Sequence, residues 1–422
     1  MLCGASRVLI NPEKGHMLAG YGPHPNAGVH DDLAVTALYL SDGAQAAVLL
    51  NFDLIAIHGA LNRRIRLAAA CAAKIPAVSV FLAVTHTHSG PEVRSQHDHM
   101  TRGTGWRKEY NDRLIRWAAQ AAAEARAAAE ECTLHYNFAM AAECMNRRFV
   151  LPDRRHLYIP THKQLAGHSD QYVDRELGIL AFRRKGALNR YKALLTNYTA
   201  HPLCVGVASS LVTADYQGAL RRTVEDTFAG CLCLSTTGAA GDQHPLLPES
   251  GFAEAQRMGA ALGSLAVARS YDAVHVTYDT RLRLARRDIT LWAKDQATRD
   301  LLPESCNRRR HPTDPRLGST IRTSVALLGI GPVLLAGVPG EMVSELGAMI
   351  KWSSPFLKTF VLFQATGAIN YVVTRNQYLW GGYEPTSSEL AAGEGERVVA
   401  KVVETAQALV ARLPLRFPTV DN

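Results

Sequence analysis

Residues 78–91 read Val78-Ser79-Val80-Phe81-Leu82-Ala83-Val84-Thr85-His86-Thr87-His88-Ser89-Gly90-Pro91. The run up to Val84 is continuous, apolar and rich in β-branched residues, which predicts a buried strand. The Ser-Gly-Pro sequence after His88 ends that strand. Because side chains two apart on a strand share a face, His86 and His88 are expected to point into the same space. Two imidazoles at the tip of a rigid strand suit a metal site or a proton relay.

The composition favours a soluble α/β protein of the cytoplasm. The 422 residues, 47% of them hydrophobic, suffice for two or three average domains or one large layered domain. No apolar run approaches the ~18 residues of a membrane span, and the N-terminus does not resemble a secretion signal. The eight scattered cysteines form no Cys-x-x-Cys pair and are typical of reduced thiols. The net charge of +8 is dispersed, which argues against a nucleic-acid partner.

Strand-like and helix-like segments alternate along the whole chain. Apolar runs on either side of Asp42-Gly43 predict a hairpin. The expected strands are 33–40, 46–51, 133–141, 177–182, 193–198, 231–235, 325–335 and 360–363. The expected helices are 59–73, 107–131, 217–229, 251–269, one from about 343, and 395–412. Without a repeat or a linker, this predicts a single large α/β domain over 1–422, with mixed β-sheets covered by helices.

Four predicted strands lead into polar side chains that are candidates for one site. The first leads to His86 and His88, and the others lead to His201, Glu341 and Tyr371. Neutral imidazoles and a carboxylate around an open position form the hydrolytic zinc pattern. Structural roles stay open at this point: Tyr371 as a core aromatic residue, and Glu341 as an acid favoured by a helix N-terminus.

Several short motifs follow one another in a fixed order over most of the chain. They are Gly28-Val29-His30, Thr85-His86-Thr87-His88-Ser89-Gly90-Pro91, Met145-Asn146-Arg147, Asp174-Arg175-Glu176, Asn197-Tyr198-Thr199-Ala200-His201-Pro202, Asp215-Tyr216-Gln217-Gly218, Val338-Pro339-Gly340-Glu341, Asn370-Tyr371-Val372-Val373-Thr374 and Tyr383-Glu384. With these motifs the sequence resembles the catalytic domain of the neutral/alkaline ceramidases, which are zinc-dependent amidases that cut the amide of ceramide.

The resemblance implies a role for each matching residue. It implies a zinc site whose ligands are His86, His201, Glu341 and Tyr371. It further implies that His88 hydrogen-bonds the substrate carbonyl, that Arg147 contacts the substrate, and that Tyr383 is a second donor to the oxyanion. Strand periodicity alone would place both His86 and His88 on the metal. A surface ion pair is the alternative role for Arg147.

The sequence departs from the family pattern in places that concern the substrate. The family's Gly-Asp-Val-Ser-Pro segment appears as Gly241-Asp242-Gln243-His244-Pro245, so His244 replaces a serine important to activity. His244 is therefore a candidate for an altered proton relay or an altered wall of the site. The chain ends near the point where the family's C-terminal immunoglobulin-like domain would begin, so we expect no such domain. These departures weaken ceramide as the substrate more than they weaken zinc amidase chemistry.

The sequence thus predicts a zinc-dependent amidase acting on a linear N-acyl substrate. The alternatives are a related enzyme that acts on a non-lipid amide, lactam or ester or runs amide formation in reverse, and a binding protein that kept the scaffold. We expect Asp53, Asp215 and Asp242 to support the metal ligands, because zinc-bound imidazoles need a carboxylate or carbonyl on the other nitrogen. A substrate smaller or more polar than ceramide, and anionic or carbonyl-rich near the scissile bond, is expected from basic and hydrogen-bonding residues near the motifs: Arg94, His97, His99, Arg147, Arg148 and His244.

Overall fold

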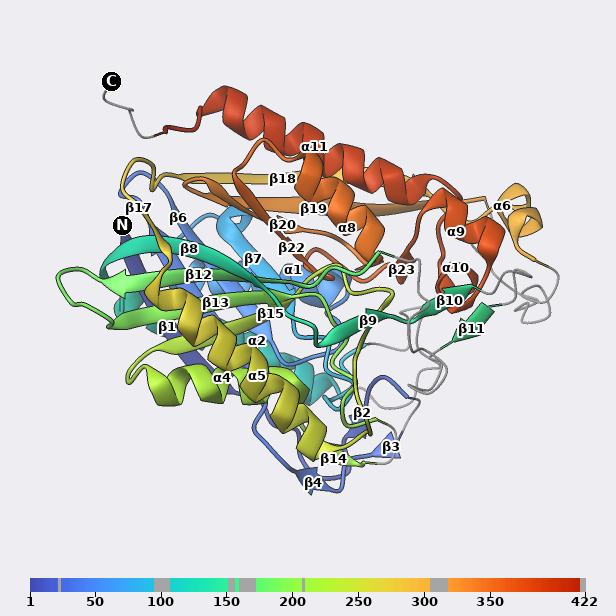
Figure 1. The fold of residues 1–422 in the computed structure, drawn as a ribbon, viewed down its shortest axis with the longest axis horizontal. Coiled ribbons are helices and arrows are strands. Elements are labelled where there is room, and N and C mark those ends of the chain that lie inside the picture. The colour runs from blue at the N-terminus through green and yellow to red at the C-terminus, as the bar shows by residue number, and fades with distance from the viewer. Residues whose placement is uncertain are drawn as a thin grey trace.

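The computed structural model describes residues 1–21, 24–94, 107–150, 156–158, 172–206, 209–303 and 318–417, with backbone only at 150 and 156–158. Two mixed β-sheets lie at its centre (Figure 1). The larger sheet has nine strands, of which eight lie in the order β15 (Leu232–Thr237), β13 (Tyr191–Tyr198), β12 (Glu176–Arg184), β8 (Glu130–Met140), β1 (Leu2–Leu9), β5 (Ala34–Ser41), β6 (Ala46–Phe52) and β7 (Val80–Val84), while β17 (Val274–Val276) pairs with β8. The smaller sheet has the order β18 (Leu282–Trp292), β19 (Thr320–Ile330), β20 (Val333–Gly337) and β22 (Lys358–Leu362).

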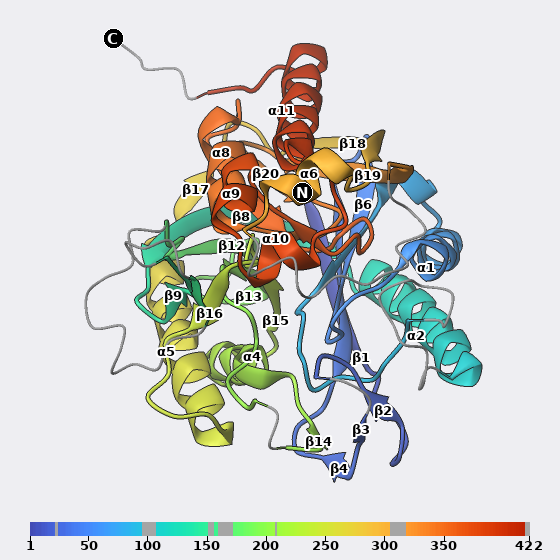
Figure 2. The ribbon, with the colours of Figure 1, turned by 90° about the vertical axis from the view of Figure 1, so that its right-hand side faces the viewer.

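Helices cover the outer faces of both sheets. In Figure 1, α11 (Glu394–Arg412) lies along the top over β18 and β19, with α8 (Ser344–Ser353) below it. Figure 2 shows the four helices that cover the larger sheet in two groups: α1 (Gly59–Ala73) with α2 (Lys108–Ala127), and α4 (Asp215–Thr227) with α5 (Phe252–Tyr271). Among the described residues, the short α-helices are α6 (Gln296–Leu301), α9 (Arg375–Trp380) and α10 (Tyr383–Ser387). The predicted fold class, mixed sheets covered by helices, is confirmed.

The central strands are mostly apolar because both of their faces are buried. In β5, Val35 and Ala37 pack against α1 and α2, whereas Leu38 and Leu40 pack between the two sheets. Alternate side chains of a strand point to opposite faces, so a strand between two apolar layers needs a continuous apolar run. α2 lies so close to β1 that a Cβ at Gly4 would be 1.9 Å from the Ala125 carbonyl oxygen.

Two sequence predictions of secondary structure are wrong in detail. The helix predicted over 107–131 ends at Ala127, and strand β8 begins at Glu130. The single strand predicted over 325–335 is a hairpin, because the chain turns at Gly331 (φ +56°) between β19 and β20. Apolar periodicity cannot detect such a turn when both strands are equally buried.

Two-stranded ladders beyond the large sheets bring together segments that are distant in sequence. β9 (Cys144–Asn146) pairs with β16 (Gln243–Pro245), and β21 (Glu341–Met342) pairs in parallel with β23 (Tyr371–Val372). Three further ladders are β14 (Leu211–Val212) with β4 (Gly28–Val29), β10 (Arg148–Val150) with β11 (His156–Tyr158), and β2 (Met17–Leu18) with β3 (His24–Pro25).

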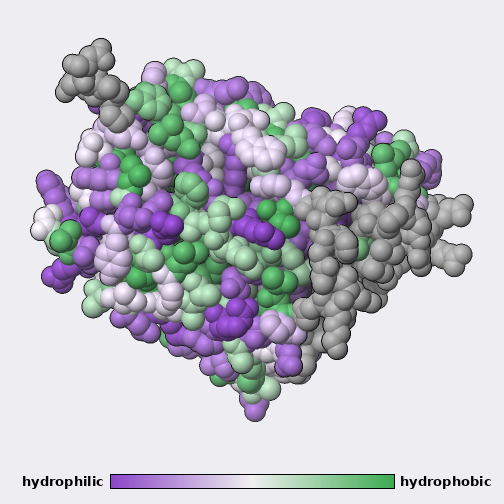
Figure 3. Space-filling model, in the orientation of Figure 1, coloured by the Kyte–Doolittle hydropathy of each residue, from purple (hydrophilic) through white to green (hydrophobic). Residues whose placement is uncertain are grey.

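The surface is mixed in character. Figure 3 shows hydrophilic and hydrophobic residues interspersed over the face seen in Figure 1. A search of the described helices for one both long and apolar enough to cross a bilayer finds none. The seven described cysteines are free, and six of them are buried.

Candidate metal centre

The two histidines of the opening stretch lie just beyond the end of β7. The backbone N–H of His86 donates to the Leu54 carbonyl at 3.0 Å, and His86 has φ +68°, in the left-handed region. This conformation is uncommon for a residue other than glycine and costs about 1–3 kcal/mol, so the surrounding structure must hold it. The Nε2 atoms of His86 and His88 are 3.3 Å apart. The rings therefore meet as predicted, but through a turn rather than through strand periodicity.

His201 reaches the same place from the end of β13. Its ring centroid is 4.8 Å from that of His86. The Nδ1 of His201 lies 2.5 Å from the Ala240 carbonyl oxygen, and the Nδ1 of His86 lies 2.6 Å from the Ile55 carbonyl oxygen. A carbonyl only accepts, so each Nδ1 carries the proton and donates it. Each Nε2 is then left with its lone pair free for a metal.

Glu341 and Tyr371 come to the histidines on neighbouring strands. They are register partners in the parallel ladder of β21 and β23. The Oε2 atom of Glu341 lies 3.6 Å from His86 Nε2 and 3.5 Å from His201 Nε2. Since these distances are too long for hydrogen bonds, the three groups surround a common point without satisfying one another.

These distances fit a metal ion. Ligand atoms around a tetrahedral zinc bound at about 2.0–2.1 Å are about 3.3–3.4 Å apart. Within the described part of the chain, His201 Nε2 and Glu341 Oε2 are buried and have no hydrogen-bond partner. His86, His88 and His201 form the group of histidines that offers nitrogens within 4.8 Å of one another. An unsatisfied carboxylate oxygen facing an unsatisfied imidazole nitrogen is the donor set expected for zinc.

Burial keeps the three imidazoles in the form that binds metal. It lowers the pKa of His86, His88 and His201 below the usual value, and the charge of Arg147 lowers the pKa of His201 further. A neutral imidazole is required for ligation, and a lowered pKa leaves it neutral at neutral pH.

Two tyrosines lie side by side at the centre. The rings of Tyr371 and Tyr383 are 5.5 Å apart. Tyr371 is buried, and its hydroxyl accepts a hydrogen bond from Arg147 Nη2 at 2.9 Å. Burial and the charge of Glu341 raise the pKa of both phenols. Tyr383 is 40% exposed, so of the two tyrosines it is the one open to solvent and to a substrate.

The arginines predicted near the substrate are each paired with an acid. Arg147 and Arg148 are buried and share the carboxylate of Glu384, whose pKa they lower despite its burial. Arg94 donates to Glu92 through its backbone N–H and its Nε, both at 2.8 Å. The donors of these arginines are therefore bonded within the protein rather than held open for a substrate, and the expectation of an anionic substrate loses that support.

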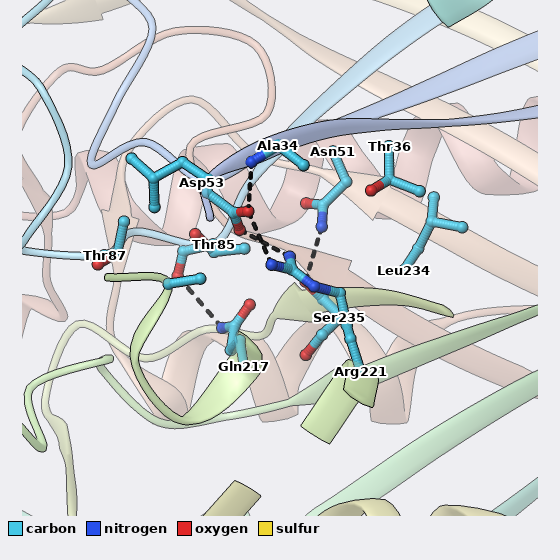
Figure 4. Close-up of polar contacts among 12 residues, drawn as sticks. Ala34, Thr36, Asn51, Asp53, Thr85, Thr87, Gln217, Arg221, Leu234 and Ser235 are labelled. Atoms are coloured by element: carbon cyan, nitrogen blue, oxygen red, sulfur yellow. Dashed lines mark hydrogen bonds and ion pairs between the residues drawn. The ribbon is translucent and has the colours of Figure 1, made fainter. Parts of the chain in front are cut away.

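The three aspartates predicted to support the metal ligands bind other groups. The backbone carbonyls of Ile55 and Ala240 accept from the ligand histidines instead. Figure 4 shows Asp53 bound by both outer nitrogens of Arg221 (2.7 and 2.8 Å) and by the Ala34 N–H. Asp215 accepts from the Cys204 and Val205 N–H groups. These hydrogen bonds hold the chain around the site rather than an imidazole.

Asp242 acts on the segments that carry the ligands. It accepts from the Ser344 N–H at 2.8 Å, at the start of α8, and from the Asn146 side chain at 3.0 Å. It thus ties the loop after β15 to β9 and to the segment after Glu341. Burial raises the pKa of Asp242 above its usual value.

His244 lies in β16, where it pairs with Met145 of β9. It is half-buried, and its Nδ1 is 2.8 Å from the Pro245 carbonyl oxygen. Its charge lowers the pKa of His201, which places His244 within electrostatic reach of the centre. His97 and His99 lie outside the described residues.

Sequence reasoning missed the residues that orient the ligands. The ring of Phe363 packs against the His86 ring with centroids 4.9 Å apart, and the side chain of Gln364 lies beside it; the 3.3 Å between Gln364 Nε2 and His86 Nδ1 is not a hydrogen bond, since Nδ1 donates to Ile55. The carbonyls of Ile55 and Ala240 carry no signal in a sequence, because any residue supplies a carbonyl. Glu384 follows Tyr383 in one of the motifs. Its place shortly after two glycines is the only sequence feature that could have suggested its buried ion pairs with Arg147 and Arg148.

Comparison with known proteins bears on the fold. No family model matches the chain, and no curated protein sequence matches it either. A solved structure of neutral ceramidase from Pseudomonas aeruginosa superposes with a TM-score of 0.76 over 99% of this chain and 76% of that chain, at 18% identity. A structure described as ceramidase complexed with C2 matches with the same TM-score and coverage, at 17% identity. The fold implied by the motifs is therefore confirmed, and this chain has the fold of the neutral ceramidases.

Proposed function

We propose that this chain is a zinc-dependent hydrolase that cleaves the carbon–nitrogen bond of an N-acyl amide. The observation that supports it most is the convergence of His86, His201 and Glu341. Glu341 Oε2 lies 3.5–3.6 Å from the Nε2 atoms of both histidines, and among the described residues neither Oε2 nor His201 Nε2 has a hydrogen-bond partner. Two imidazoles and one carboxylate are the ligand set of hydrolytic zinc sites, and a fourth position stays open for water. Tyr371 is the candidate for an additional, weaker ligand.

When bound, zinc supplies Lewis-acid activation of water near neutral pH. The chain's own groups then act on the amide. Glu341 accepts or relays the proton of the attacking water. His88 and Tyr383 donate hydrogen bonds to the developing oxyanion, His88 from beside His86 and Tyr383 from the exposed rim. The leaving amine needs a proton, and Glu341 is the acid at hand to return it.

His88 has a second possible role, as a ligand. Its Nε2 is as close to His86 Nε2 as the other ligand atoms are to one another. His88→Ala separates the two roles, because loss of a ligand removes zinc whereas loss of an oxyanion donor lowers kcat about 100- to 1,000-fold with zinc retained.

The deciding experiment is metal analysis of the purified protein followed by a panel of N-acyl substrates. The panel contains a long-chain ceramide, a short-chain ceramide, a short N-acyl amino acid and a matched ester. We expect about one zinc per chain and hydrolysis of at least one amide, abolished by Glu341→Gln. The matched control is Glu345→Gln, one turn away at the start of α8. A protein that binds no divalent metal, or a metal-loaded protein that cleaves no amide, would contradict the proposal.

The same panel decides the substrate class. Arg147 and Arg148 are buried and bonded to Glu384 rather than open to a substrate, so we expect neutral amides to be cleaved at least as well as the N-acyl amino acid. Cleavage of the ester alone would favour the non-amide alternative.

A further inference from the structure

A compact group of charges lies behind the tyrosine side of the centre. Glu384, in the first turn of α10, accepts from Arg147 Nε at 2.8 Å and from Arg148 Nη1 at 2.7 Å. The three side chains are 0–1% exposed. Arg148 also donates to the Gly381 carbonyl, just before α10. We call Arg147, Arg148 and Glu384 the buried charge cluster.

The cluster joins segments that are distant in sequence. Arg147 lies between β9 and β10, and Glu384 lies more than two hundred residues later. Two guanidinium groups and one carboxylate leave a net positive charge out of contact with water. Such an arrangement is costly unless every group is well bonded, so it is weak evidence for stability as such. A role in placing neighbouring groups accounts for it better.

Arg147 is the member that reaches the centre. Its Nη2 donates to the Tyr371 hydroxyl at 2.9 Å and to the Gly241 carbonyl at 2.7 Å. Gly241 follows Ala240, whose carbonyl orients His201. One guanidinium thus contacts the candidate phenol ligand and the loop that orients an imidazole ligand. The rigid planar fork of arginine can hold these partners and Glu384 at once, which a lysine cannot.

From this geometry we infer that Arg147 is a positioning residue for the metal centre rather than a contact for the substrate. Glu384 holds its guanidinium in place, and the guanidinium holds the Tyr371 hydroxyl beside Glu341. The inference rests on the proposed zinc centre and changes the role that family resemblance implies for Arg147. It also assigns Glu384, which had no role, to the support of the centre.

A double-mutant cycle on zinc affinity tests this. The variants are Arg147→Lys, Tyr371→Phe and the pair together, and the dissociation constant for zinc is measured by chelator competition on metal-free protein. We expect Arg147→Lys to weaken zinc binding about 10- to 100-fold, as loss of a group that orients a ligand does. In the Tyr371→Phe background the same change should have a clearly smaller effect, because the hydroxyl is gone and only the contact with the Gly241 carbonyl remains.

Arg7→Lys is the matched control. Arg7 pairs with Glu225 and a backbone carbonyl in the same manner, on β1. It should leave zinc affinity unchanged. Glu384→Asp is the second variant, since it keeps the charge and shortens the side chain by one methylene. It should weaken zinc binding in the wild-type background and have a smaller effect beside Tyr371→Phe. Thermal melts check that each variant is folded.

Two results would overturn the inference. One is unchanged zinc affinity in Arg147→Lys with a raised KM for the amide substrate, which would make Arg147 a substrate contact. The other is a double variant whose loss of zinc affinity equals the product of the two single losses, which would mean that Arg147 acts independently of Tyr371. Because the readout is metal affinity, a protein that binds zinc but hydrolyses no amide refutes the proposed function without affecting this test.

Discussion

Replacing His201 by alanine is the most direct test of the metal centre. His201 is fully buried, its Nδ1 is held by the Ala240 carbonyl, and its Nε2 has no partner other than the proposed metal within the described chain. The substitution removes one ligand and leaves Glu341 and His86 in place. We therefore expect zinc binding to weaken strongly while the fold persists.

The size of the effect follows from the ligand count. Zinc binding to four-ligand protein sites is worth about 10–16 kcal/mol, or about 2.5–4 kcal/mol for each ligand on average. At 1.4 kcal/mol for each tenfold change, the loss of His201 corresponds to about two to three powers of ten in the dissociation constant. Zinc present at about 1,000 times the wild-type dissociation constant adds about 4 kcal/mol to the free energy of unfolding. The same zinc concentration adds only about 0.4–1.4 kcal/mol to the variant.

The assay compares zinc-loaded and chelator-treated protein, for the wild type and for the variant. Only the zinc-dependent increment in the unfolding temperature is used, because removal of a buried ring destabilises the metal-free protein as well. Metal content is measured after gel filtration. His275→Ala, at an exposed histidine on β17, is the control for loss of a histidine elsewhere. Full metal content with an undiminished increment in His201→Ala would refute the assignment.

Three further predictions concern groups around the centre. Gly20→Ala should lower amide hydrolysis with zinc retained, because Gly20 has φ +110° and an added Cβ would lie 2.6 Å from His88 Nδ1. Arg221→Ala should lower the free energy of unfolding in urea by about 3–5 kcal/mol, because it leaves Asp53 buried without its partner. Burial, with the charge of Arg183 beside it, lowers the pKa of His135 to about 4. The unfolded chain therefore binds the proton first, and stability should fall from about pH 6.5 to about pH 4, less so in His135→Gln.

Each of these has a matched control. Gly15→Ala has a similar φ of +81° with nothing within 4 Å of the added Cβ, so activity should persist. Arg222→Ala removes a half-exposed arginine adjacent to Arg221, and its cost should be under about 1 kcal/mol. For His135, the free energy of unfolding of metal-free wild type and of metal-free His135→Gln is measured as a function of pH. The two curves should diverge below about pH 6.5, and parallel curves would contradict the assignment to His135.

Much of the architecture could be predicted from local sequence. Helices α1 and α11 begin and end within one residue of their expected bounds, because a long amphipathic repeat determines which face is buried. The hairpin of β5 and β6 also follows from its turn residues. The errors fell where two elements of equal apolarity meet, at the end of α2 and at the turn between β19 and β20.

The sequence by itself determined which side chains end the buried strands, since apolar runs followed by His86, His201 and Glu341 are visible without a structure. Only the tertiary structure decided how they meet. The meeting depends on a left-handed residue at His86, on a parallel ladder that places Glu341 beside Tyr371, and on the carbonyls of Ile55 and Ala240. Backbone carbonyls and dihedral angles are common to all residue types, so no residue pattern announces them. The pairing of Arg147 and Arg148 with Glu384 was hidden for a related reason: whether an arginine faces water or a buried acid depends on chain segments more than two hundred residues apart.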